Sequence, residues 1–360
     1  PYPRFLTYPT YSYDANKQDW KSQTNYPIGK LYPERTDSWE VGLDATLFKD
    51  FKLSGSFYYA NTYNQTFYAD LSLSSGYSNI PIQSGNIMNE GLEMSLGYNK
   101  QWKDFSFNTN YTLTWNKNRV KRLADGVYNY ATGQPIQMPE LSPLTYGHTD
   151  ARLILRVGGS MGDVYGQRLL KRDLNGYILN EEGVGLAMEN KETYLGSILP
   201  KMNMGWSLGF GYKGVNLGMT FTGRFGGIVI SETQSVLDAA GVSKVSADVR
   251  DAGGVQINQS KVSAQTYYQT IQGTAAYYTY SATNVRLGEL SLSYTLPKKW
   301  FDNKVGMTVG LVGKNLWMIY CKAPFDPELT TSAASNFYQG FDAYMLPSTR
   351  NFGFNVKFQF

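Results

Sequence analysis

Few residues in this 360-residue sequence could do covalent chemistry. Ser160 lies in GGSMG (158–162), which fits the G-x-S-x-G pattern of a serine-hydrolase nucleophile. That nucleophile needs a strand-turn-helix context and a later histidine, yet the single histidine, His148, precedes Ser160. We therefore predict a short hairpin turn here, assign no catalytic residue and do not expect an enzyme.

Metal and redox chemistry have equally little support. One histidine nearly excludes histidine-based zinc or iron sites, and Cys321 alone cannot form an internal disulfide. The acidic residues of KRDLNGYILNEEG (171–183) lack the spacing of an EF-hand calcium loop, whereas Asn175-Gly176 predicts a hairpin turn. We expect no metal and no cofactor. The 33 basic and 29 acidic residues are scattered, so nucleic acid is not an expected partner.

The remaining candidate chemistry is aromatic and lies in TYYQTIQGTAAYYTYSAT (266–283). A tyrosine has a flat apolar face and a polar tip, which suit stacking on a sugar ring or gripping a peptide. The alternative is packing in a loop or in an aromatic girdle at a membrane interface. The candidate ligand-binding residues are Tyr267, Tyr268, Tyr277, Tyr278 and Tyr280. Nearby polar residues favour a glycan over a peptide: Asp238, Asp248, Arg250, Asp251 and Asn258.

Composition indicates which elements must position these residues. Charged residues make up 17% and aromatic residues 15% of the chain, and its mean hydropathy is -0.37. No stretch approaches the roughly 18 uncharged apolar residues of a spanning helix. A thinly charged, aromatic-rich chain without such a helix is typical of an outer-membrane β-barrel, although a secreted β-sandwich would share part of this profile.

Apolar and polar residues alternate along many segments, as strands with one apolar face require. The stripes span about the 9–11 residues of a tilted transmembrane strand, more than the five or six usual in a soluble sandwich. One stripe, FGFNVKFQF, continues to Phe360 and is expected to pair with the first strand of a closed barrel. Strands are predicted near 1–13, 39–48, 53–66, 86–99, 105–118, 150–158, 163–171, 203–212, 215–230, 284–296, 304–319 and 350–360.

The gaps between these strands alternate between short and long, the rhythm of a membrane barrel with short periplasmic turns and long extracellular loops. The short gaps are 49–52, 100–104, 159–162, 213–214 and 297–303. The long gaps are 14–38, 67–85, 119–149, 172–202, 231–283 and 320–349. The sequence therefore predicts an all-β chain that forms a transmembrane antiparallel β-barrel.

Five motifs, in order, resemble those of SusC-like TonB-dependent outer-membrane transporters. They are LYPERTDSWEVGLDATLFKD (31–50), SGNIMNEGLEMSLGY (84–98), NVRLGELSLSYTLPKKW (284–300), GKNLWMI with FDPEL (313–329), and LPSTRNFGFNVKFQF (346–360). Asn284 stands where the family usually has tyrosine. The resemblance covers nearly the whole chain.

The resemblance implies a barrel of about 22 strands, of which the roughly twelve predicted here would be the second half. Residues 1–360 would then be the C-terminal part of a TonB-dependent receptor barrel, without the plug domain and the first half of the barrel. It implies localisation in the outer membrane of a Gram-negative bacterium of the Bacteroidetes. It also implies active import of oligosaccharides or peptides, with a SusD-like surface lipoprotein and with the TonB complex contacting the missing part.

Two other functions fit part of the pattern. A passive porin or an adhesion barrel would also have long membrane strands, but porins usually line the lumen with rings of charged residues. A soluble carbohydrate-binding sandwich would share the composition and would stay dispersed without detergent. An upstream plug domain would distinguish the transporter from the porin.

Overall fold

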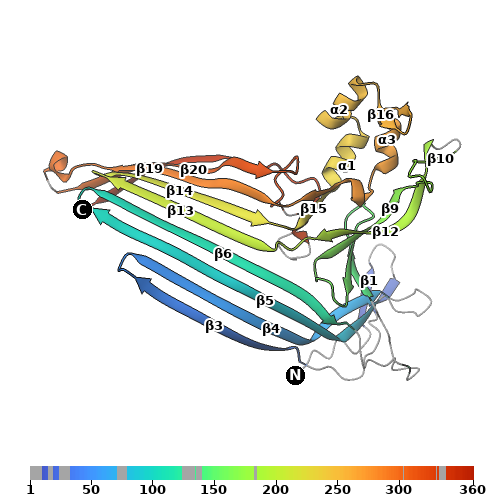
Figure 1. Ribbon diagram of the computed structural model, residues 1–360, viewed down its shortest axis with the longest axis horizontal. Helices are drawn as coiled ribbons and strands as arrows, with labels where there is room; N and C mark the ends of the chain where they lie inside the picture. Colours follow the sequence, from blue (N-terminus) through green and yellow to red (C-terminus); the bar gives the residue numbers. More distant parts are fainter. Residues whose placement is uncertain are drawn as a thin grey trace.

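A computed structural model of the chain describes residues 10–14, 19–23, 33–70, 79–123, 134, 140–181, 185–302, 304–329, 331 and 338–360. Its largest element is a nine-stranded antiparallel sheet, here called the wall sheet, in the order β22-β20-β19-β14-β13-β6-β5-β4-β3 (Figure 1). Its strands are β3 (Arg35–Leu47), β4 (Phe51–Asp70), β5 (Asn79–Trp102), β6 (Phe105–Arg122), β13 (Met202–Tyr212), β14 (Val215–Phe225), β19 (Asn284–Thr295), β20 (Gly306–Cys321) and β22 (Asn351–Gln359). The sheet is open, with β3 and β22 at its two edges.

The two ends of the wall sheet differ. Short connections at 48–50, 103–104 and 213–214 lie at one end, the turn end, and the long connections gather at the other, the loop end (Figure 1). Lys213 and Gly214 both have positive φ, as a two-residue hairpin turn requires. A Cβ on Gly214 would lie 2.7 Å from the Thr295 carbonyl oxygen, so only glycine fits there.

The two faces of the wall sheet also differ. Across β22, β20 and β19, the paired residues Phe354, Leu311 and Leu292 are 78%, 64% and 48% exposed. In β3 and β4, at the other edge of the sheet, residues of the opposite face are polar, as in the paired Asp44 and Ser54. Apolar side chains exposed along a whole sheet face are costly in water and favourable in lipid. The alternation that predicts the strands therefore places their apolar side chains on the outer face of a membrane barrel.

The number of wall strands differs from the prediction of about twelve. The predicted strands 150–158 and 163–171 exist as β8 (Arg152–Arg156) and β9 (Asp163–Leu170), but they belong to a separate four-stranded sheet, β12-β9-β8-β7. Consecutive residues of both strands are buried, so neither has a free lipid-facing side. In the predicted strand 1–13, residues 1–9 lie outside the described residues, and β1 (Thr10–Asp14) pairs only with β2 (Asp19–Gln23).

The segments 140–201, 226–283 and 322–349, here called the loop layer, carry most of the remaining structure. No helix among the described residues is long and apolar enough to cross a membrane. The strands of the loop layer are β7 (Glu140–Thr145), β8, β9, β10 (Asn180–Glu181), β11 (Gly185–Leu186), β12 (Met188–Ser197), β15 (Ile228–Ser231), β16 (Val255–Ile257), β17 (Ser260–Val262), β18 (Thr279–Ser281) and β21 (Phe341–Asp342). Its helices are α1 (Glu232–Ala239), α2 (Lys244–Asp251), α3 (Ala264–Ile271) and the 3₁₀ helix η3 (Ala275–Tyr277), while a second 3₁₀ helix, η4 (Lys298–Phe301), lies in the connection from β19 to β20.

Unlike the wall sheet, the loop layer has buried apolar cores. One core joins its three segments through residues such as Leu153, Ile230 and Phe341, which are 0%, 0% and 2% exposed. The three helices in 231–283, which the sequence reading treated as a plain loop, start at serine caps. Ser231, Ser243 and Ser263 each accept a hydrogen bond from the backbone amide three residues later.

Candidate functional site

The GGSMG turn lies at the loop end of the wall sheet, not at the turn end with the short connections as predicted. The Val120 amide of β6 donates to the Gly159 carbonyl, and the Gly158 amide donates to the Val120 carbonyl, both at 2.8 Å. The Met161 amide donates to Asn118 Oδ1, also at 2.8 Å. The turn therefore extends the edge of β6 beyond the point where its pairing with β13 ends, at Trp115 and Met202.

A cleft of about 750 Å³, lined by both polar and apolar residues, lies beside this turn. Its walls come from the exposed edge of β6, from the turn itself and from the connections before β13 and β15. Its lining includes Ser160, Asp163 and Tyr194, and Asn116 and Asn118 of β6. A cleft of this size is within the range of small-molecule sites.

Two titratable groups of the cleft, Asp163 and Tyr194, are hydrogen-bonded to each other. Asp163 accepts hydrogen bonds from the Ser160 amide at 2.8 Å and from the Tyr194 hydroxyl at 3.2 Å. Burial raises the pKa of Asp163 despite these bonds. Burial and the adjacent Asp163 charge raise the pKa of Tyr194 to about 12. Ser160 lies in a turn between two strands and bonds to Ser197, so its context is not that of a hydrolase nucleophile.

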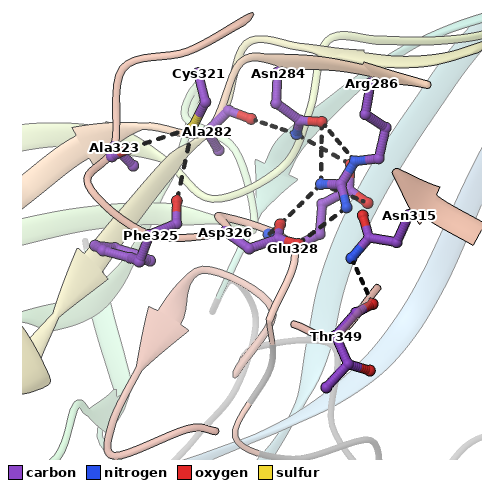
Figure 2. A network of polar contacts seen from close by, with 10 residues as sticks. All are labelled: Ala282, Asn284, Arg286, Asn315, Cys321, Ala323, Phe325, Asp326, Glu328 and Thr349. Atoms are coloured by element: carbon purple, nitrogen blue, oxygen red, sulfur yellow. Dashed lines mark hydrogen bonds and ion pairs between the residues drawn. The ribbon is translucent and has the colours of Figure 1, made fainter. Parts of the chain in front are cut away.

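A buried ion pair joins two of the sequence motifs. Arg286 of β19, in the 284–300 motif, donates to both carboxylate oxygens of Asp326, in FDPEL, at 3.0 and 2.8 Å (Figure 2). Their side chains are 11% and 7% exposed. Asn284 Nδ2 donates to Glu328 Oε1 at 3.0 Å, which adds a second link between the same segments. The network attaches the 322–349 segment to the wall sheet.

The charge state of this network follows from its bonds. Burial alone would raise the pKa of Asp326, but the hydrogen bonds from Arg286 and from the Glu328 amide hold it below its usual value. Asp326 is therefore ionised at neutral pH. Asn315 of GKNLW similarly donates to the carbonyl of Thr349, which belongs to the terminal motif, at 3.1 Å (Figure 2).

The predicted turn at Asn175-Gly176 and the free Cys321 are also in the described residues. Gly176 has a φ of 86°, and Arg172 pairs with Ile178 across a hairpin turn, so the predicted hairpin is confirmed. Cys321 ends β20, and its thiol donates to the Ala323 carbonyl at 3.4 Å. No group of three or more His, Cys, Asp or Glu side chains within the described part of the chain could hold a metal ion.

The five candidate tyrosines gather in one region of the loop layer. Tyr268 and Tyr278 are 7% and 3% exposed and form a core with Leu170, Leu186, Ile257 and Ile271, against which Tyr267, Tyr277 and Tyr280 pack. The Tyr277 hydroxyl accepts a hydrogen bond from the Leu170 amide at 3.1 Å. All five thus pack inside the loop layer, and their contact with a ligand stays a prediction.

The polar residues expected to accompany the tyrosines lie in different places: in the packing of the loop layer, at its surface and at a cavity. Asn258 is used in the fold, because its amide exchanges two hydrogen bonds with the Ile178 backbone. Asp248 forms an exposed ion pair with Lys244. Asp238 and Arg250 line a second cavity together with Tyr268. The fifth predicted residue, Asp251, is exposed and lies 3.9 Å from Arg250 Nε. The sequence contained no signal that separated these five residues.

Comparison with known proteins supports the predicted resemblance. No family model matches the chain. TonB-dependent receptor P3 of Formosa agariphila is 26% identical over 93% of this chain and 35% of its own length, and receptor P39 of the same bacterium is 22% identical over 92% and 36%. Two structures of the RagAB peptide transporter superpose with TM-scores of 0.69 and 0.67, at 19% and 18% identity, over 98% of this chain and 38% of theirs.

These likenesses show which proteins the chain resembles. The chain is similar over nearly all its length to TonB-dependent receptors, and its fold is similar to part of the β-barrel of outer-membrane transporters. The predicted fold class and outer-membrane location are therefore confirmed, although these described strands alone do not close a barrel. The chain spans about a third of the length of the curated relatives it matches. The relatives are receptors and transporters by name, which fits a chain that is not an enzyme.

Proposed function

We propose that the protein containing this chain imports oligosaccharides or peptides across the outer membrane, driven by TonB. The observation that carries the proposal is the contrast between the two faces of the wall sheet, combined with a loop layer packed at one end. An apolar outer face fits lipid, a polar inner face fits a lumen, and structured loops on a rigid barrel are where ligands bind. The RagAB relatives are peptide importers, and the curated relatives are TonB-dependent receptors.

The chain would form part of a closed barrel in this scheme. The unpaired outer edges of β3 and β22 need partners in lipid, where each unpaired backbone group costs several kcal/mol. Other segments of the same protein would supply the missing strands, the plug domain and the TonB-contacting segment. A lumen of a barrel with about 22 strands needs such a plug.

Uptake by cells tests this function. A strain lacking the full-length protein should fail to grow on the natural oligosaccharide or peptide as sole nutrient, and disruption of TonB should have the same effect. A passive porin or an adhesion barrel would leave growth independent of TonB. Growth that needs the protein but not TonB would therefore contradict active import.

We also propose a SusD-like surface lipoprotein as a partner. Three long segments lie at the loop end, and nearly all of their described residues belong to the loop layer: 172–202, 231–283 and 320–349. The full-length protein should co-purify in mild detergent with a lipoprotein that crosslinks to these segments and not to the turn at 213–214. Recovery of the barrel protein alone would argue for a transporter without a lid.

A further inference from the structure

The helices α1, α2 and α3 line an open cavity of about 480 Å³ within the loop layer. Figure 1 shows the three helices side by side, away from the wall sheet. Each helix contributes a polar residue to the cavity lining: Asp238 from α1, Arg250 from α2 and Gln269 from α3. The volume is within the range of small-molecule sites.

Asp238 is a buried residue of this cavity that has an oxygen available to accept a hydrogen bond. It is 5% exposed, and its Oδ1 accepts hydrogen bonds from the Ser243 hydroxyl and from Gln234 Nε2, the latter at 2.7 Å. Among the described residues, none donates to its second oxygen, Oδ2. A buried carboxylate with one oxygen committed and one available can accept a hydrogen bond from a ligand.

The rest of the lining complements this acceptor. Arg250 donates to the Gly241 carbonyl through Nη1 at 3.2 Å, and its Nε lies 3.9 Å from Asp251 Oδ1 in an exposed ion pair. The other guanidinium nitrogen, Nη2, can donate to a ligand. Gln265 and Gln269 lie one turn apart on α3, and Tyr268, which is 7% exposed, also lines the cavity. Asp238 and Arg250 are the charged residues of the lining, and their charges cancel.

We infer that this cavity binds a neutral sugar unit of an oligosaccharide. A sugar presents closely spaced hydroxyls that both donate and accept, together with one apolar ring face. The lining offers a carboxylate acceptor, guanidinium and amide donors and an aromatic surface, with no net charge to attract an ion. The inference rests on the proposed import function for its biological sense, and it narrows the five candidate tyrosines to Tyr268.

Binding to the purified full-length protein in mild detergent tests the inference without any need for transport. The probes are cellotetraose, xylotetraose, laminaritetraose and maltotetraose, with tetra-alanine as the peptide alternative, measured by titration calorimetry. At least one tetraose should bind, and Asp238→Asn should weaken it about tenfold or more, because the available acceptor becomes a donor or loses its charge. Asp238→Asn retains an oxygen for Ser243 and Gln234, so folding should persist.

Two further variants separate binding from folding. The double variant Gln265→Ala and Gln269→Ala changes exposed side chains and should also weaken the tetraose about tenfold. Asp248→Asn is the matched control, because it removes a carboxylate of α2 that lies outside the cavity and pairs with Lys244. It should bind like the wild type.

Three results would overturn the inference: no tetraose binds, only tetra-alanine binds, or Asp238→Asn and the wild type bind equally. Each differs from a failure of the proposed function, which would show as unimpaired growth without the protein or without TonB. Sugar binding by a protein that imports nothing would support the cavity and contradict the import.

Discussion

The wall sheet and the loop layer place apolar side chains in opposite ways. In the wall sheet they are exposed: Phe352 and Phe354 of β22 are 79% and 78% accessible. In the loop layer they are buried, as are Leu153 and Ile230 at 0%. One chain thus contains a region that depends on lipid and a region that could pack in water. Apolar side chains therefore stabilise the wall sheet by contact with lipid and the loop layer by contact with one another.

Deletion of residues 351–360 should have the largest effect. It removes β22 and with it the hydrogen bonds to β20 and the apolar stripe of that edge. We expect loss of a heat-modifiable barrel from the outer membrane, measured by gel mobility with and without boiling. As a control, deletion of 173–177, the tip of a loop-layer hairpin, should leave barrel levels unchanged. Equal barrel levels for both deletions would contradict the lipid dependence of the wall edge.

Breaking the link between the two regions should have the next largest effect. Arg286→Met leaves the Asp326 carboxylate buried without its guanidinium partner, which typically costs about 3–5 kcal/mol. The 322–349 segment should detach from the wall sheet and become sensitive to limited proteolysis, while the barrel remains assembled. The double variant Arg286→Met and Asp326→Leu should recover much of the protection. Arg35→Met is the control, since its pair with Asp37 is exposed. Unchanged proteolysis of Arg286→Met would show that this pair does not hold the segment.

A charge on the outer face of the wall sheet should lower the free energy of unfolding, whereas the same charge at a turn should not. Phe354→Asp places a carboxylate within the apolar face and should destabilise the barrel, by less than the roughly 2–4 kcal/mol that a lysine costs at the bilayer midplane. Phe48→Asp is the matched control, because Phe48 is 86% exposed in the turn that follows β3. Urea unfolding in lipid vesicles measures both. Similar losses for the two variants would mean that exposure alone, and not lipid, decides the cost.

The sequence predicts the wall sheet better than the loop layer for a physical reason. Long alternating stripes such as 105–115 predict one exposed apolar face, and β6 covers that range. The stripes at 150–158 and 163–171 alternate too weakly to separate a lipid-facing strand from one buried on both faces. The placement of Asp238 beside Tyr268 depends on how three short helices pack, which no local pattern encodes. Serine caps such as Ser231, followed by Gln234, were the available signal for those helices.

Acidic pH should weaken the Arg286–Asp326 ion pair, with a smaller effect than the substitutions above, whereas alkaline pH should not. The pKa of Asp326 is lowered in the folded state, so the unfolded chain binds a proton more readily, and the contribution of Asp326 is complete above its unfolded pKa of about 3.9. That contribution should be lost as the pH falls through the folded pKa. Hydrogen exchange of the 322–349 segment should therefore be constant from pH 5 to 8, after correction for intrinsic rates, and protection should fall below about pH 4. Loss of protection at higher pH would assign the link to other groups.

Two adjacent tyrosines of the loop layer should respond oppositely to loss of a hydroxyl, and this is the smallest expected effect. The Tyr277 hydroxyl accepts a bond from the Leu170 amide, so Tyr277→Phe leaves that amide unpaired and should cost about 1–3 kcal/mol. The buried Tyr278 hydroxyl has no hydrogen-bond partner among the described residues, so Tyr278→Phe should be neutral or slightly stabilising. Hydrogen exchange at Leu170, Ile257 and Ile271, which belong to the same core, reports both changes locally. If Tyr278→Phe instead loosened this core, the prediction would be wrong. Unchanged binding of tetraoses would then show that the Tyr278 hydroxyl has a structural partner within the protein.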